Sequence, residues 1–205
     1  MGQSERRREV AVAGHTGDEA TARSALHDED AAVRATALTA LERLGALRDD
    51  DLRAALRDGD GRVRRRAAEL AAAAAHGGVD LLSALLGDTE PLVAEAAAFA
   101  LGERGALGSA EAVAGGVLAA LCTTATTHAD ALVREAAVAA LGAIGHPDGL
   151  ATILHATTDK PAVRRRAVLA LAPFDGPDVD AALQRALTDR DWQVRQAAED
   201  LLADE

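Results

Sequence analysis

One pattern recurs along almost the whole chain and limits what the chain can fold into. Its clearest copy begins at Asp130, continues as an apolar series and ends at Gly145. When the copies are aligned on the valine three residues after this aspartate, the successive separations are 30, 30, 40, 30 and 31 residues. The six aligned residues are Val33, Val63, Val93, Val133, Val163 and Val194. A nearly fixed period of this size predicts stacked structural units instead of one closed core.

The spacing inside each copy predicts a helix with one buried face. Apolar residues stand at the valine and at four, seven, eight and eleven residues after it, which places them on one side of an α-helix. An acidic residue three positions before the valine is a typical helix N-cap, as at Asp60. Glycines after the last core residue predict left-handed helix ends at Gly45, Gly105 and Gly145.

A shorter helix is expected before each of these core helices. We predict the shorter helices at residues 18–27, 49–57, 79–86, 109–124, 148–156 and 179–188, with a threonine-rich turn at 123–128 after the fourth. Residues 4–13 resemble a core helix without a partner. The predicted organisation is therefore a single domain, 1–205, with a half-repeat cap at 1–16 and six repeats at 17–46, 47–77, 78–106, 107–146, 147–175 and 176–205.

Composition restricts both the core and the class of partner. Aromatic residues make up 1% of the chain, so the core must consist of Ala, Leu and Val, whose small side chains allow helices to approach closely. The formal net charge of -11 argues against a nucleic-acid partner, since phosphate binding normally needs a basic face. Neither a signal-peptide core nor a membrane-spanning apolar run is present, so a cytoplasmic protein is expected.

The pattern resembles HEAT repeats, in the short bacterial form also found in phycobilisome-lyase-type proteins. The resemblance is carried by residues 58–68 and 189–198, including Asp58, Asp60, Val63, Arg64, Ala67 and Ala68, and Asp189, Asp191, Val194, Arg195 and Ala198. It implies an all-α fold, a right-handed α-solenoid of HEAT repeats with about thirteen helices.

The resemblance also implies a structural role for one arginine and one aspartate in most repeats. The arginine directly follows the repeat valine, and the aspartate lies five residues before it. In the family such residues form a ladder of charge-assisted hydrogen bonds between neighbouring repeats. The ladder residues are Arg34, Arg64, Arg134, Arg164 and Arg195, with Asp28, Asp58, Asp88 and Asp189.

The pattern is irregular at one junction. Ala94 replaces the ladder arginine, Arg104 takes an apolar core position, and His128 takes a ladder aspartate position. The separation of 40 instead of 30 also leaves ten extra residues between Gly105 and Asp130. We expect either an altered packing angle with a protruding turn, or a tolerated insertion in a surface loop.

Residues two, six and nine positions after each valine point away from the predicted core, onto what is the concave side in HEAT-type solenoids. In the middle repeats they form an apolar floor flanked by charges, suited to a helix or peptide, with Phe99 as the anchor. The alternative is that curvature buries Phe99. The candidate partner-binding residues are Arg65, Glu95, Phe99, Gly102, Glu135, Ala139, Arg165 and Leu169.

No catalytic, cofactor or metal motif is found, since the single Cys122 and the scattered histidines offer no ligand set. We therefore predict a monomeric, non-catalytic scaffold that binds a protein or peptide on its concave surface. One alternative is a DNA-binding or repair protein similar to the HEAT-like alkylpurine glycosylases, using Arg66, Arg166, Asp191 and Trp192 beside Arg65 and Arg165. A phycobilin-lyase-like or chaperone role is a further alternative.

Overall fold

The computed structural model describes residues 2–73 and 78–203, and these residues form thirteen α-helices and no strand. The predicted repeat boundary at residue 77 lies outside the described residues. Two short 3-10 helices, η1 and η2, add one turn each at Ala25–His27 and Pro147–Gly149. The α-helices are α1 Gln3–Thr16, α2 Glu19–Ser24, α3 Ala31–Arg43, α4 Asp49–Ala55, α5 Gly61–Ala71, α6 Val79–Leu85, α7 Pro91–Ala106, α8 Gly115–Thr127, α9 Ala131–Ile144, α10 Leu150–Ala156, α11 Pro161–Ala170, α12 Pro177–Ala186 and α13 Trp192–Ala203.

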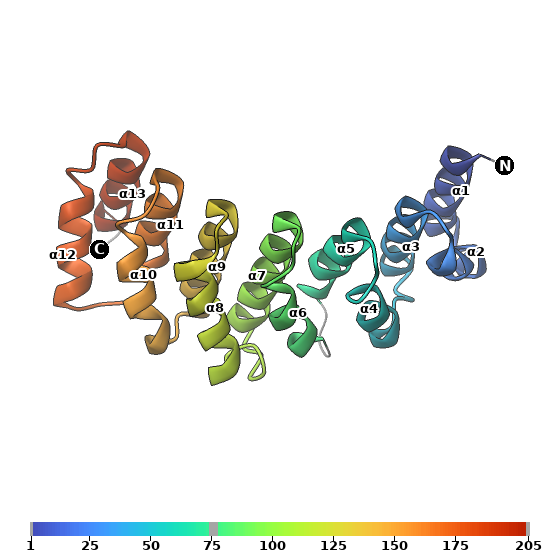
Figure 1. Ribbon diagram of the computed structural model, residues 1–205, viewed down its shortest axis with the longest axis horizontal. Coiled ribbons are helices and arrows are strands. Elements are labelled where there is room, and N and C mark those ends of the chain that lie inside the picture. The colour runs from blue at the N-terminus through green and yellow to red at the C-terminus, as the bar shows by residue number, and fades with distance from the viewer. Residues whose placement is uncertain (1, 74–77, 204–205) are drawn as a thin grey trace.

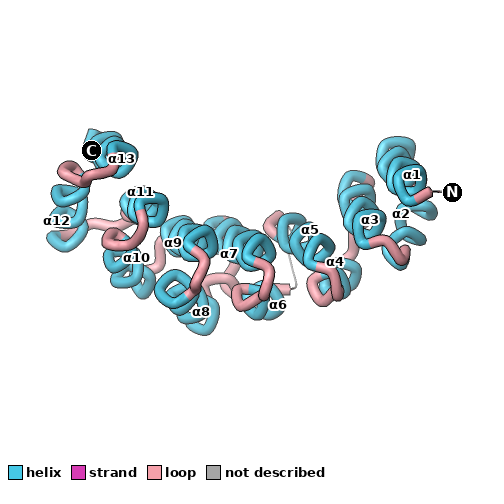
Figure 2. Tube along the Cα trace, turned by 45° about the horizontal axis from the view of Figure 1, so that its top comes forward, coloured by secondary structure: helices cyan, strands magenta, loops and turns pink. Residues whose placement is uncertain are grey.

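The helices are stacked in two rows that together form a curved array, with the two termini at opposite ends (Figure 1). Helices α1, α3, α5, α7, α9, α11 and α13 pack against one another in succession, and we name them the inner row. Helices α2, α4, α6, α8, α10 and α12 form the outer row. Figure 2 shows the inner row on the concave side of the arc. The predicted all-α solenoid is therefore confirmed.

The inner-row helices begin where the sequence supplies a capping side chain. The backbone N–H groups of Ala32 and Arg62 donate to the carboxylates of Asp30 and Asp60 at 2.8 and 2.9 Å. Helix α7 begins after Glu90 without such a bond, but its first residue is Pro91, which has no N–H to satisfy. The local sequence thus determines where these helices start.

The valines of the repeat pattern lie in the core, as the helical spacing requires. All six are buried, and the small residues four positions later, such as Ala97 and Ala137, are also fully covered. Because aromatic side chains are rare, neighbouring helices pack through leucine side chains that fit between alanines. Leu101 and Leu141 are examples, with no exposed surface.

The fourth unit differs from the prediction. The helix expected at 109–124 begins only at Gly115, and the residues expected to form a threonine-rich turn instead complete helix α8. The hydroxyl groups of Thr123, Thr124 and Thr127 each donate to the carbonyl oxygen four residues earlier, at 2.8 to 2.9 Å. These bonds stay inside the helix, so the threonines are compatible with its last turns.

The extra residues of this unit are placed before α8 instead of after it. Helix α7 continues through Gly105, which has no left-handed conformation, and the chain turns at Gly108 with φ of 84°. The prediction of a stop at Gly105 was wrong because its missing side chain serves packing: a Cβ there would lie 2.5 Å from Cγ1 of Ile144. Residue Ala112 in the following turn is fully buried, so this segment packs against the array.

Candidate functional site

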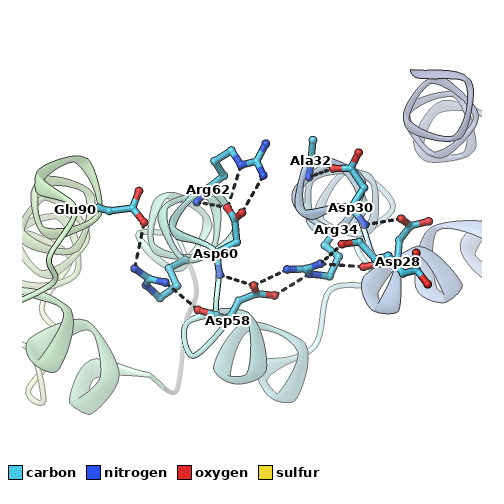
Figure 3. Close-up of polar contacts among 10 residues, drawn as sticks. Asp28, Asp30, Ala32, Arg34, Asp58, Asp60, Arg62 and Glu90 are labelled. Atoms are coloured by element: carbon cyan, nitrogen blue, oxygen red, sulfur yellow. Dashed lines mark hydrogen bonds and ion pairs between the residues drawn. The ribbon is translucent and has the colours of Figure 1, made fainter. Parts of the chain in front are cut away.

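The charged residues of the repeat pattern form bridges between consecutive repeats. Arg34 donates to both carboxylate oxygens of Asp58, at 2.8 and 2.6 Å, and to the carbonyl oxygen of Asp28 at 2.9 Å (Figure 3). Arg64 binds both carboxylate oxygens of Asp88 in the same way, at 2.8 and 2.9 Å. Such two-point arginine–carboxylate contacts fix both distance and orientation, so these residues hold neighbouring repeats in register.

Two members of this ladder were missed by the sequence pattern. Arg134 pairs with Asp159 at 2.7 and 2.8 Å, but Asp159 lies four residues before its valine instead of five. Arg6 of the first helix pairs with Asp28 at 3.4 Å, and its similarity to Arg164 was the available signal. Arg164 itself pairs with Asp189 at 2.9 and 2.7 Å.

Arg195, the last predicted ladder arginine, makes only one of the two kinds of contact that the other ladder arginines make. Arg195 donates to the carbonyl oxygen of Asp189 at 2.7 Å. Within residues 2–73 and 78–203 it forms no ion pair with a carboxylate, so it does not bridge two repeats there. The expectation that Arg195 bridges repeats is therefore corrected.

The ladder carboxylates are held in their charged form. Burial by itself would raise the pKa of Asp88, but hydrogen bonds from Arg64 and the Glu90 backbone, with the nearby positive charge, outweigh it and lower the pKa below 3.8. For Asp159 the hydrogen bond from Arg134 is the largest effect, and the pKa is lowered as well. The ladder is therefore an ionic network at neutral pH.

The ladder is interrupted between α7 and α9, where the sequence is irregular. Ala94 is fully buried in the arginine position. The Nδ1 atom of His128 accepts the backbone N–H of Asp130 at 3.1 Å, a role that the ladder aspartates play in other repeats. Arg104 is buried, with 3% of its surface exposed. This junction therefore keeps the turn geometry but has no arginine–carboxylate bridge at the ladder position.

Close packing of small residues replaces the bridge at this junction. A Cβ atom on Gly102 would lie only 2.7 Å from Cα of Ala140, so the backbones of α7 and α9 touch. Gly102 is consequently buried between helices, and its main role is packing. Gly142 makes the same contact with Ala170 in the next pair of helices.

A groove of about 470 Å³ lies between α7 and α9, and we name it the α7–α9 groove. It brings together five of the eight residues predicted to bind a partner, and six that the prediction did not include. The five are Glu95, Phe99, Gly102, Glu135 and Ala139, and the six are Glu103, Leu132, Ala136, Ala140, Ala143 and Arg166.

Three predicted residues lie outside the lining of this groove. Arg65 belongs to α5 and is paired with Glu69 at 2.9 Å. Arg165 and Leu169 belong to α11, where Leu169 is exposed. The prediction placed equivalent positions of every repeat on one surface, whereas the α7–α9 groove is lined by residues of α7 and α9 together with Arg166 of α11.

Phe99 is exposed at the groove. Its side chain is 51% exposed, so the curvature of the array does not bury it. Leu132 at the start of α9 is also exposed and lines the same groove. The floor between them consists of small alanines, which leaves the two larger apolar groups accessible to a ligand.

The charges around the groove are unevenly paired. Glu135 lies 3.6 Å from Nε of Arg166 and 3.9 Å from Arg165, so its charge is balanced. Among the described residues, the carboxylates of Glu95 and Glu103 receive no hydrogen bond and form no ion pair. The wall formed by α7 is therefore acidic, whereas the wall formed by α9 and α11 has two arginines for one glutamate.

No grouping suggests chemistry elsewhere in the described chain. Three potential metal ligands are not found together in residues 2–73 and 78–203. Within those residues, no helix has the length and apolar character to cross a bilayer. Trp192 is exposed at the start of α13, while the carboxylate of Asp191 accepts the backbone N–H of Gln193 at 2.9 Å, as a helix cap.

Comparison with known proteins identifies the repeat. Residues 118–203 match the family model of HEAT repeats, and no curated protein matches the chain. Among solved structures, an engineered protein superposes with a TM-score of 0.70 at 22% identity, covering 91% of this chain and 97% of its own. The E. coli protein YibA reaches 0.70 at 18% identity, covering 99% and 75%.

A designed armadillo repeat protein, solved in complex with the peptide (KR)4, has a TM-score of 0.61 at 17% identity, with 97% of both chains covered. Identities this low show a shared fold and nothing about function. The family match covers residues 118–203, which lie within α8–α13, and the described residues as a whole have the α-solenoid fold of these solved structures.

Proposed function

We propose that the chain is a non-catalytic scaffold that binds a segment of a partner protein in the α7–α9 groove. The observation that carries this proposal is the exposure of Phe99 beside the α7–α9 groove, between two helices of the inner row. A large ring held on a rigid helix loses little conformational entropy on binding, and aromatic anchors of this kind dominate many interfaces. The designed armadillo protein with its bound peptide supports peptide binding as a use of this fold.

A DNA-binding role has less support from the groove. The arginines that would contact phosphate lie beside carboxylates, two arginines to each: Arg65 and Arg66 share Glu69, and Arg165 and Arg166 share Glu135. The acidic α7 wall would repel a phosphate backbone, and binding through phosphates needs free cations. Nor does any feature of the described residues specifically favour catalysis.

Affinity capture from the native lysate tests the scaffold proposal. The bait is the full chain, compared with Phe99→Asp in the groove and Leu107→Asp outside it, where Leu107 is 77% exposed. We expect a partner to be retained by the wild type and by Leu107→Asp. With Phe99→Asp, the partner's Kd, measured by calorimetry after purification, should rise about tenfold or more.

Two results would count against the proposal. Equal retention of every partner by the Phe99→Asp and wild-type proteins would exclude the groove. Salt-sensitive retention of the wild-type protein on a DNA column, without a protein partner, would favour the nucleic-acid alternative.

A further inference from the structure

The acidic wall of the groove has a regular spacing. Glu95, Phe99 and Glu103 line the groove and follow one another at intervals of four residues along α7. Since an α-helix rises 1.5 Å per residue, neighbours in this series are about 6 Å apart along the helix axis, and the two carboxylates about 12 Å. The wall thus presents a negative charge, an apolar ring and a second negative charge in one row, inclined to the axis of α7.

The charges on this wall call for a cationic occupant. Glu95 and Glu103 have no ionic partner within the described residues, whereas Glu135 opposite is balanced by Arg165 and Arg166. The whole chain carries a formal net charge of -11, which adds to the attraction. Two lysine or arginine side chains, spaced to reach both carboxylates, would neutralise the charge of this wall.

An extended chain suits the α7–α9 groove, which holds about 470 Å³. An extended strand, about 5 Å by 10 Å in section, is thinner than a helix, which is about 10–12 Å across.

The repeat distance of an extended chain also matches the wall. Residues two apart in a strand point to the same side and are separated by about 6.6 Å, compared with about 6 Å between successive side chains on the α7 wall. Three alternate residues of an extended peptide can therefore face Glu95, Phe99 and Glu103 together.

We propose that the α7–α9 groove binds an extended basic peptide with the order basic, any, apolar, any, basic. Its two cations pair with Glu95 and Glu103, and the apolar side chain between them packs on Phe99. This inference rests on the proposed function and specifies the chemical class of the partner segment.

The test uses a fluorescein-labelled peptide, Gly-Arg-Ala-Leu-Ala-Arg-Gly, and fluorescence anisotropy with the full chain. We expect saturable binding that weakens as salt is added, because exposed charge pairs are screened. The double variant Glu95→Gln/Glu103→Gln should raise Kd by about fivefold or more. A matched control, Glu42→Gln/Glu199→Gln, removes two exposed carboxylates from α3 and α13 and should leave Kd unchanged.

A second peptide tests the spacing. Gly-Ala-Arg-Leu-Arg-Ala-Gly has the same composition, but its arginines directly flank the leucine, so in an extended chain they face the side opposite to the leucine. We expect its Kd to be about threefold higher or more. Circular dichroism of each variant establishes that the fold is retained, as expected for Glu→Gln changes at positions that are not buried.

Three results would overturn the inference: no binding of the first peptide, equal affinity for the rearranged peptide, or an equal loss of affinity in the control variant. The scaffold proposal is tested separately by Phe99→Asp in affinity capture. If that variant loses a partner while the basic peptide fails, the groove binds a segment of different chemistry and only the present inference falls.

Discussion

Glycine positions set the distance between neighbouring helices in the inner row. Gly14, Gly102 and Gly142 each face the backbone of an alanine on the next helix, with 2.7–2.8 Å between the position of a Cβ and the alanine Cα. A backbone atom cannot move aside alone, so one added methyl group must separate two helices. The shape of the α7–α9 groove therefore depends on a residue that has no side chain.

Gly102→Ala should lower the free energy of unfolding by about 1–3 kcal/mol, because overpacking outweighs the helix propensity that alanine adds. Urea unfolding measures this change. Gly116→Ala is the control, since nothing lies within 4 Å of a Cβ at Gly116 of α8. That control should be neutral or stabilising by up to about 1 kcal/mol. Equal stability of the two variants would show that the close contact does not fix the helix spacing.

At the scale of elements, adjacent repeats are joined in two different ways. Most junctions combine apolar packing with an arginine–carboxylate bridge, as Arg64 and Asp88 do between the second and third units. The α7–α9 junction has Ala94 instead and relies on helix contact. The junction at which the groove forms therefore has no arginine–carboxylate bridge at the ladder position.

Arg64→Met should destabilise the chain by about 2 kcal/mol or more, because the carboxylate of Asp88, only 7% exposed, loses its cation. The matched control is Arg62→Met on the same helix. Arg62 is 65% exposed and pairs with Asp60 at 2.8 Å, so its loss should change stability by no more than about 0.5 kcal/mol. Thermal unfolding of both variants measures the difference, and a similar loss in both would contradict a special role for the ladder.

At the scale of the whole molecule, the repeated ladder makes stability depend on pH. The pKa values of Asp58, Asp88, Asp159 and Asp189 are all lowered from 3.8 in the folded chain. A carboxyl group with a lowered pKa binds its proton less readily in the folded chain than in the unfolded chain. Its contribution to stability is therefore complete at a pH above its pKa in the unfolded chain. That contribution is lost as the pH falls through the folded value.

We therefore expect the urea midpoint to be nearly constant above about pH 5 and to fall steadily below pH 3.8. Asp60, whose pKa is lowered to about 2 mainly by its hydrogen bond from Arg62, titrates late in this range. Asp88→Asn isolates one ladder member. The variant should be less stable than the wild type near neutral pH, and this difference in the free energy of unfolding should shrink as the pH falls below 3.8. A gap that stays constant with pH would show that the charge of Asp88 is not what stabilises the junction.

The sequence by itself determined the period, the helices and the buried face. Apolar spacing and capping act within one helix, so Val133 and Asp130 suffice to place α9 and its start. The repetition of such units then requires stacking, because one unit cannot cover its own apolar side. Most of the arginines and aspartates of the ladder could be named in advance through the resemblance to HEAT repeats, although the bridges join different repeats.

Only the tertiary structure decided where the groove lies and which residues line it. Phe99 is exposed because α7 and α9 approach closely at Gly102 and leave the ring at the edge of their contact. Glu103 and Arg166 line the groove, and Arg65 does not. The distance and angle between neighbouring helices depend on all their contacts together, so equivalent positions in the sequence need not have equivalent surroundings.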